Sequence, residues 1–246
     1  MKLLKEILAK ILAVWAILVF IVSMLLIIIP SWLVGIIPEP RRTTVFIDIS
    51  RVWMKIFFVL TGVRRIFKGK KNFKKGENYI VVCNHRSFMD VPLTSPGIPG
   101  PNKTIAKIDM MKIPVFSLIY RRGSVLVDRK SEASRKASYG KMKDVLAMGM
   151  HMCIYPEGTR NKTREPLQRF QDGAFRLAID TKKAVMPAVV FYTANILPVH
   201  KGFYFWPHPV EMHFLEPVQV QPGDTTESIK TRVFELMRNY YVAHNR

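Results

Sequence analysis

The sequence predicts an α/β fold with a mixed, largely parallel sheet flanked by helices, preceded by an N-terminal hydrophobic two-helix membrane element. Short buried-strand patterns alternate with helical patterns over most of the chain, which is the order typical of parallel strands joined by helices. Before them, Ile11 to Ile29 contains no charged residue. We expect three regions: a membrane-anchoring helical hairpin at 1–63, a basic linker at 64–75 and the α/β domain at 76–246.

Composition limits the function classes. The 246 residues can bury a real core, which excludes a peptide hormone and a large multidomain machine. Lys and Arg number 38 against 18 Asp and Glu, giving a net charge of +20, while 49% hydrophobic residues argue against a disordered basic tail. The charge indicates anionic partners: nucleic acid, an anionic membrane, or phosphorylated and acidic substrates. Two cysteines, Cys83 and Cys153, are too few for a disulfide scaffold and favour a reducing compartment.

The N-terminal segment has the length of a membrane helix. A helix over Ile11 to Ile29 is about 28 Å long, close to the thickness of bilayer hydrocarbon, and no small-residue cleavage site follows it. Pro30 should end or kink this helix. Val52 to Val63 is apolar but interrupted by Lys55, so we expect a second helix that lies in the interface or re-enters. Both flanks are basic, which leaves a spanning segment and a hairpin in one leaflet both open; a buried soluble hairpin is the alternative.

The predicted linker is strongly basic. Arg64 to Lys75 contains seven basic residues and no acidic one. Anionic headgroups attract such a run beside a membrane, although a solvated charged linker has the same composition. Nucleic acid is less well supported, because no groove-entering motif or zinc-ligand spacing accompanies the charge.

The α/β pattern begins after Gly76. We expect strands at Tyr79–Cys83, Lys103–Lys107, Val125–Val127, Met152–Tyr155, Val185–Phe191 and Val210–Val220. We expect helices at Ser131–Met148, at Gly173–Asp180 and from the capping-box pattern Asp224-Thr-Thr-Glu227 to Ala243.

Active sites in such sheets lie at the carboxyl ends of the strands. The first strand is followed by Asn84-His85-Arg-Ser-Phe-Met-Asp90. A histidine whose ring is held by a carboxylate can act as a general base, and the loop must bring the two side chains together. The alternatives are that Asp90, followed by Val91 and Pro92, caps a helix and that His85 is a hydrogen-bonded turn residue.

Two further strand ends carry arginine. After Met152–Tyr155 comes Pro156-Glu157-Gly158-Thr159-Arg160, where an arginine beside a glycine suits a phosphate, and Glu157 can accept from a hydroxyl or hold the arginine. The alternative is a surface turn with a local Glu–Arg pair. Asp128-Arg129 follows Val125–Val127 in the same way.

Together these motifs resemble, in order and spacing, the four blocks of the glycerophospholipid acyltransferases. The blocks are Asn84-His85 with Asp90, the run from Gly123 to Arg129, Tyr155-Pro-Glu-Gly-Thr-Arg160, and the strand around Val185-Met-Pro187. Within that family the chain is most similar to the bacterial 1-acyl-sn-glycerol-3-phosphate acyltransferases, whose N-terminal two-helix element resembles residues 1–63. The fold implied is that of the glycerol-3-phosphate acyltransferase-like domains.

The resemblance implies the site residues. His85 would be the general base and Asp90 its orienting partner. The substrate-binding residues would be Arg129, Glu157, Gly158, Thr159, Arg160 and Lys107. Asp109 stands where the family usually has glutamate, and Gln171 where a lysine is common.

The resemblance also implies an activity. A fatty acyl group would pass from acyl-CoA or acyl carrier protein, as co-substrate, to the free hydroxyl of 1-acyl-sn-glycerol-3-phosphate (lysophosphatidic acid), giving phosphatidic acid in phospholipid biosynthesis. No cofactor, metal or nucleic acid is expected. Anionic membrane lipids are the expected partners, at a bacterial inner membrane with the catalytic domain on its cytoplasmic side.

Three alternatives remain open, two of which use the same residues. One is O-acylation of another lyso-lipid, such as a lyso-aminolipid, and a second is a thioesterase or lipid hydrolase in which the His–Asp pair activates water. The third is a non-catalytic lipid-binding module, which would not need His85 and Asp90. Cys83 and Cys153 lie in apolar strand runs, so we expect buried, inert thiols rather than a nucleophile.

Overall fold

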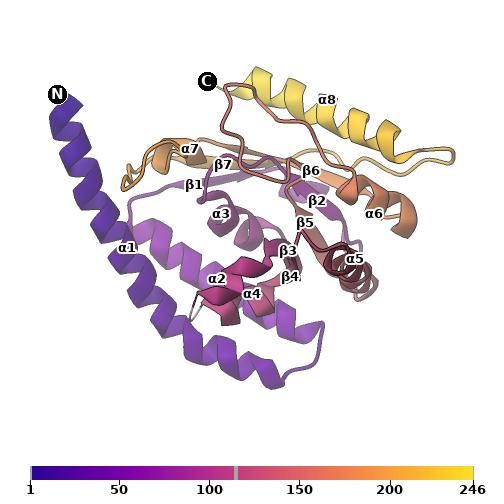
Figure 1. The fold of residues 1–246 in the computed structure, drawn as a ribbon, viewed down its shortest axis with the longest axis horizontal. Helices are drawn as coiled ribbons and strands as arrows, with labels where there is room; N and C mark the ends of the chain where they lie inside the picture. The colour runs from indigo at the N-terminus through magenta and orange to yellow at the C-terminus, as the bar shows by residue number, and fades with distance from the viewer. Residues whose placement is uncertain (1, 114–115, 246) are drawn as a thin grey trace.

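The computed structural model describes residues 2–113 and 116–245 and begins with two long helices that pack side by side (Figure 1). Helix α1 spans Lys2–Leu33 and helix α2 spans Arg41–Leu60, with a 3₁₀ turn at Val34–Ile36 between them. Pro30 lies inside α1, so the helix does not end there. The indole of Trp53 in α2 donates to the Ser23 hydroxyl of α1 at 2.9 Å, which joins the two helices.

Helix α2 begins at Arg41, well before the apolar stretch expected from Val52. Its first half carries charges that interrupt the apolar run, yet Thr43, Phe46, Ile47 and Ser50 recur at helical spacing and are buried. The polar residues therefore occupy the outer face of an amphipathic helix whose inner face packs on the domain.

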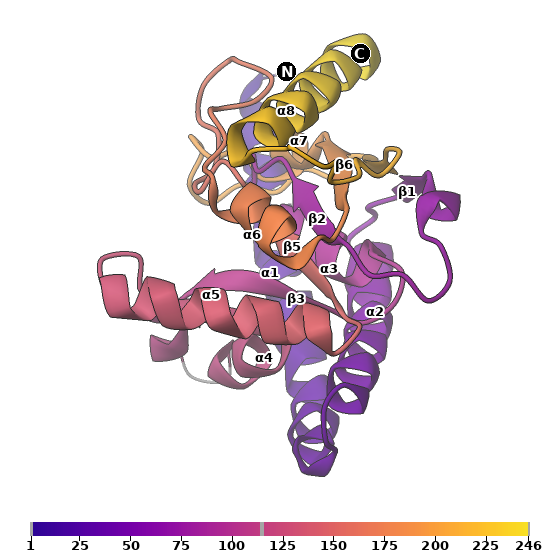
Figure 2. The ribbon, with the colours of Figure 1, turned by 90° about the vertical axis from the view of Figure 1, so that its right-hand side faces the viewer.

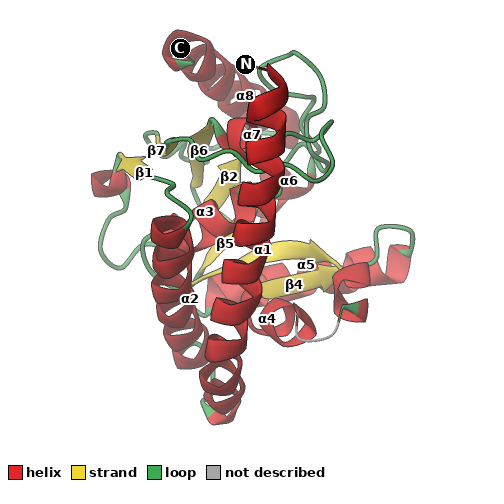
Figure 3. Ribbon diagram, turned by 90° about the vertical axis from the view of Figure 1, so that its left-hand side faces the viewer, coloured by secondary structure: helices red, strands yellow, loops and turns green. Residues whose placement is uncertain are grey.

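Helix α1 is buried along one face and exposed along the other. Small residues such as Ala9, Ala13 and Ala16 face the protein, and the amide of Phe205 donates to the Ala9 carbonyl at 3.2 Å. The opposite face exposes large apolar side chains over the length of the helix: Leu4, Ile7, Ile11, Val14, Leu18, Val22, Leu25, Ile29 and Trp32. In Figure 3, α1 runs the full height of the molecule. It is long and apolar enough to cross a bilayer, the one such helix among the described residues.

The segment expected as a basic linker is instead part of the sheet. Strand β1, Arg65–Lys68, pairs in parallel with strand β7, Val210–Phe214, and a 3₁₀ turn at Lys70–Asn72 follows it. The basic side chains hide this strand in the sequence because, at the edge of the sheet, three of its four residues are only half-buried and Lys68 is exposed.

The sheet has seven strands in the order β1-β7-β6-β2-β5-β3-β4. The remaining strands are β2, Ile80–Cys83; β3, Asn102–Lys107; β4, Ser124–Val127; β5, His151–Ile154; and β6, Val185–Phe191. Every neighbouring pair is parallel except β6 and β7. The expected mixed, largely parallel sheet is confirmed, with β2, β5 and β6 at its centre.

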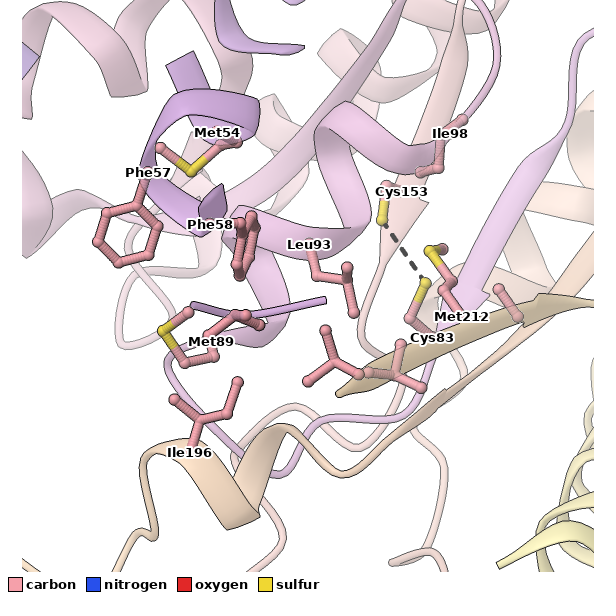
Figure 4. Packing of buried hydrophobic residues seen from close by; sticks show 14 of the residues in the cluster. Met54, Phe57, Phe58, Cys83, Met89, Leu93, Ile98, Cys153, Ile196 and Met212 are labelled. Carbon is pink, nitrogen blue, oxygen red and sulfur yellow. Dashed lines mark hydrogen bonds between the residues drawn. The ribbon is translucent and has the colours of Figure 1, made fainter. Parts of the chain in front are cut away.

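Alternate side chains of the central strands enter two separate cores. Val81 and Cys83 of β2 face the core shared with α1 and α2, together with Leu93 of α3, Asp90–Gly97 (Figure 4). Ile80 and Val82 face the opposite core. That second core is covered by α5, Glu132–Ala147; α6, Gly173–Thr181; and α8, Thr226–His244 (Figure 2).

Most of the expected elements begin or end one residue away from their predicted bounds, and strand β7 differs by more. Strand β7 stops at Phe214, and Val218 returns only as an isolated bridge to Val185, so the strand expected to reach Val220 is shorter. Helix α8 is capped by Thr225 and Ser228, one residue later than the Asp224–Glu227 pattern suggested. Two short helices, α4 at Phe116–Gly123 and α7 at Thr193–Ile196, were not expected.

Candidate active site

The loop after β2 is held against strand β6. The side-chain amide of Asn84 donates to the Val190 carbonyl at 2.9 Å, and the Val190 amide donates back to Asn84 Oδ1 at 2.7 Å. This paired contact imitates one more step of the β2–β6 ladder after the strand itself has ended. His85 therefore leaves the carboxyl end of a central strand in a fixed direction, as the sequence predicted.

The loop brings His85 and Asp90 into direct contact. Nδ1 of His85 lies 2.6 Å from Oδ2 of Asp90. The same carboxylate oxygen accepts the amides of Arg86 at 2.7 Å and Ser87 at 2.8 Å. Asp90 opens helix α3 and is 1% exposed, whereas His85 keeps 18% of its side-chain surface. The carboxylate thus binds the loop and the imidazole, and it does not act as the side-chain cap of α3, whose N-cap is Met89.

The histidine ring is supported from one side by an aromatic ring. Tyr155, directly after β5, stacks on His85 with ring centroids 4.4 Å apart. The Tyr155 hydroxyl hydrogen-bonds to the hydroxyl of Thr94 in α3 at 2.6 Å, and burial raises its pKa well above the usual value. The tyrosine therefore stays neutral and fixes the plane of the imidazole.

Glu157 is buried and binds backbone, which contradicts the alternative of an exposed Glu–Arg turn. Oε1 accepts the amide of His85 at 2.8 Å, and Oε2 accepts the amide of Gln168 at 2.9 Å. The His85 carbonyl accepts the Asn161 amide at 2.6 Å. Burial raises the pKa of Glu157, which these amide bonds partly offset. The β5 loop and the His85 loop are consequently fixed to each other.

The arginines meet at the turn between Tyr155 and Arg160. The Gly158 amide bonds to the Tyr155 carbonyl at 3.0 Å, and Gly158 has φ of 72°, a backbone conformation that favours glycine. The guanidinium of Arg129, which follows β4, donates to the Gly158 carbonyl. Thr159 is exposed. The structure therefore places Thr159 and Arg160 on the segment that bonds to the His85 loop, and the Arg129 side chain reaches that segment from the end of β4.

Arg160 lies over an exposed aromatic ring. Its guanidinium carbon is 3.6 Å from the ring centroid of Phe88, in the His85–Asp90 loop, and the Phe88 side chain is 63% exposed. Arg86 is turned away instead, donating to the carbonyls of Thr163 and Glu165 at 3.1 and 3.0 Å.

Lys107 stands apart from these residues. It ends strand β3, pairs with Val127 in the ladder and forms an ion pair with Asp109 at 2.6 Å. Its side chain is 54% exposed. The lysine thus lies at the carboxyl end of its strand, as the other site residues do, but its side chain is paired with Asp109.

Two site residues were not found from the sequence. Tyr155 was placed in a strand and in the Tyr155–Arg160 block but was given no role, and Thr193, whose hydroxyl donates to Oδ1 of Asp90, lies far along the chain. Only their positions in the sequence could have indicated them: Tyr155 directly follows strand β5, and Thr193 comes two residues after strand β6. The cysteines match their expectation: Cys83 and Cys153 are fully buried with sulfurs 3.9 Å apart (Figure 4), and burial raises the pKa of the Cys83 thiol well above its usual value.

The sequence is similar to those of curated proteins from other organisms. A 1-acyl-sn-glycerol-3-phosphate acyltransferase from Borreliella burgdorferi is 30% identical over 146 residues, covering 59% of this chain and 58% of that protein. A probable 1-acyl-sn-glycerol-3-phosphate acyltransferase from Mycoplasma pneumoniae is 28% identical over 160 residues, covering 62% and 57%. The chain thus spans little more than half the length of these curated relatives.

Similarity to a solved structure extends over the whole chain. The crystal structure of the 1-acyl-sn-glycerophosphate acyltransferase PlsC from Thermotoga maritima superimposes with a TM-score of 0.79, covering 99% of this chain and 97% of that one at 24% identity, which shows a shared fold. A family model described as acyltransferase matches residues 64–191, from the residue before β1 to the end of β6. The chain therefore belongs to the acyltransferase family.

Proposed function

We propose that the protein transfers a fatty acyl group from acyl-CoA or acyl carrier protein to the free hydroxyl of 1-acyl-sn-glycerol-3-phosphate, giving phosphatidic acid. The observation that carries this proposal is the His85–Asp90 pair, with Nδ1 to Oδ2 at 2.6 Å, at the carboxyl end of a central strand. The names of the curated relatives support the same acceptor.

The pair suits a proton transfer at Nε2. Asp90 engages Nδ1, so Nε2 is the ring nitrogen that accepts the hydroxyl proton of the acceptor. The acceptor oxygen bonds to the thioester carbonyl carbon, the carbon–sulfur bond breaks, and the departing thiolate takes the proton back from the imidazolium. A general base of this kind contributes about 10²–10⁴-fold, and no acyl-enzyme is needed because the acceptor itself is the nucleophile.

Arg129 and Arg160 supply the positive charge for the acceptor phosphate. Both lie at the Gly158–Arg160 turn, whose neighbour Asn161 bonds to the His85 backbone. A phosphate held at this turn places the hydroxyl of the same molecule beside His85, which converts a bimolecular encounter into a positioned one. The net charge of +20 suits an anionic acceptor and an anionic donor.

Helix α1 places this chemistry at a membrane. Its outer face is apolar from Leu4 to Trp32, and its charged residues, Lys2, Lys5, Glu6 and Lys10, lie off the centre of that face. Glu6 forms an ion pair with Lys201, and Lys5 lies 4.9 Å from the Trp206 ring centroid. Because the inner face is packed on the domain, we propose that α1 lies along the interface of an anionic bilayer. Acyl-CoA and acyl carrier protein are cytoplasmic, which supports the cytoplasmic face of a bacterial inner membrane.

The test uses purified protein in lipid vesicles with labelled acyl-CoA or acyl carrier protein, with and without lysophosphatidic acid. The proposal predicts labelled phosphatidic acid only when lysophosphatidic acid is present. Label released as free fatty acid without an acceptor would show a thioesterase. Label transferred to a lyso-aminolipid but not to lysophosphatidic acid would show a different acyltransferase, and either result would overturn the proposal.

A further inference from the structure

The second carboxylate oxygen of Asp90 has a donor of its own. Oδ2 accepts from His85 and from two backbone amides, whereas Oδ1 accepts from the hydroxyl of Thr193. Asp90 is 1% and Thr193 2% exposed, so bulk water has little access to this contact. A buried carboxylate oxygen that loses its donor keeps its charge without compensation.

The backbone before Thr193 is held in an unusual conformation. Tyr192 has φ of 66°, in the left-handed region that residues other than glycine rarely adopt. It separates strand β6 from helix α7 and turns the chain so that Thr193 begins the helix and its hydroxyl reaches Asp90. Strained backbone that the surrounding structure maintains is common where a side chain must be aimed.

Residues on both sides of Tyr192 hold the His85–Asp90 loop at two more points. The Ser87 hydroxyl donates to the Leu197 carbonyl at 2.9 Å, and Asn84 exchanges two hydrogen bonds with the Val190 backbone. Three contacts from residues 190–197 thus bracket the His85–Asp90 loop. Of these, only the Thr193 contact reaches the carboxylate that orients the imidazole.

We infer that Thr193 is a positioning residue for the reaction, which fixes the rotation of the Asp90 carboxylate and limits the negative charge that it presents to His85. This inference rests on the proposed function. The hydroxyl holds Oδ1, so Oδ2 stays in line with Nδ1. The same hydrogen bond takes up part of the negative charge of the carboxylate, so less of that charge faces Nδ1 than would without the Thr193 hydroxyl.

Thr193→Val tests this inference because valine keeps the shape and removes the hydroxyl. We expect kcat to fall about tenfold or more, because Asp90 loses a hydrogen bond to its charged carboxylate. The acceptor KM should stay within about twofold, because no contact with the substrate is removed. The acid limb of the pH–rate profile should move to higher pH, because the uncompensated carboxylate favours the imidazolium. Thr193→Ser should restore both.

The control is Thr181→Val. Thr181 is half-buried, and its hydroxyl donates to the Leu177 carbonyl of its own helix, far from Asp90 in the hydrogen-bond network. This variant should leave kcat and the pH profile unchanged. If Thr193→Val lowers kcat without moving the acid limb, or if Thr193→Ser behaves like Thr193→Val, the hydroxyl has no positioning role.

A second readout does not need the activity. The Nδ1 proton of His85, bonded to Asp90, should give a low-field proton NMR signal that is absent in His85→Gln. Thr193→Val should shift this signal, and Thr181→Val should not. If the wild type fails to transfer acyl groups, the proposed function is wrong, and an unchanged NMR signal would separately overturn the role of Thr193.

Discussion

The carboxylate of Glu157 accepts the backbone amide of His85 at 2.8 Å and so joins two motifs 72 residues apart in the chain. Its other oxygen accepts the amide of Gln168. Glu157 is 4% exposed, so this bridge is inside the protein. The residue that resemblance assigns to the substrate pocket thus also sets the position of the histidine.

Replacing Glu157 with Gln should weaken the bridge. The glutamine amide offers one acceptor oxygen, so one of the two backbone amides would face an NH₂ group. We expect the free energy of unfolding to fall by about 1–3 kcal/mol, with a parallel loss of kcat, in denaturant unfolding and acyl-transfer assays. Glu165→Gln is the control because the Glu165 side chain is exposed. Equal stability of the two variants would contradict the bridge.

His151 should make stability fall in mild acid. Its Nδ1 accepts the Tyr79 amide at 3.1 Å, and burial lowers its pKa from 6.5 to about 4. The folded state therefore favours the neutral ring. Its contribution to the free energy of unfolding is fully present above the pKa of about 6.5 that histidine has in the unfolded chain. As the pH falls from there through the folded-state pKa, this contribution is lost, a total of about 3 kcal/mol.

Unfolding in denaturant at pH 7 and pH 5 measures this contribution. His151→Asn keeps an acceptor for the Tyr79 amide but does not titrate, so its stability should change less between the two pH values than that of the wild type. His200→Asn changes an exposed histidine and should leave the wild-type dependence intact. Identical pH dependence in wild type and His151→Asn would show that His151 is not the cause.

Arg160 should control acceptor binding. Arg160→Ala removes the guanidinium that lies over Phe88 beside the His85 loop, and we expect the KM for lysophosphatidic acid to rise about tenfold or more with a smaller change in kcat. Arg164→Ala removes an exposed arginine of the same loop and should have little effect. Steady-state kinetics with varied acceptor measure both, and an unchanged KM in Arg160→Ala would remove it from the phosphate site.

The outer face of α1 should bind the bilayer. Ile11 and Leu18 are exposed there at 59% and 52%, and placing lysine at both positions costs apolar contact with lipid at the depth of the acyl chains. We expect the double variant to float with anionic vesicles much less than the wild type. Val242→Lys, on α8 and 59% exposed, is the control. Equal flotation of all three proteins would exclude α1 as the anchor.

The sequence predicted the elements whose apolar pattern is uninterrupted. Strand β6 has the expected bounds, Val185–Phe191, because all seven residues are buried and apolar. Strand β1 and the first half of α2 were missed for the opposite reason: their polar side chains lie at an edge or on an outer face. The spacing of apolar residues along the sequence indicates which residues are buried. An element that is only half-buried therefore gives a weak apolar pattern.

The His85–Asp90 contact could be predicted because both residues belong to one short loop. Thr193 could not, since it is 103 residues from Asp90 and no motif joins them. Its partnership depends on the β2–β6 pairing, which places the ends of both strands together. The role of Glu157 depends likewise on how two loops pack, a property of the folded chain.

Acyl transfer by His85→Ala in vesicles shows whether His85 removes the proton of the acceptor hydroxyl. His200→Ala is the matched control, and vesicle binding is measured on the same samples. We expect a loss of at least about 100-fold in kcat for His85→Ala, with vesicle binding retained and His200→Ala unaffected. Transfer within about tenfold of the wild type by His85→Ala would contradict it.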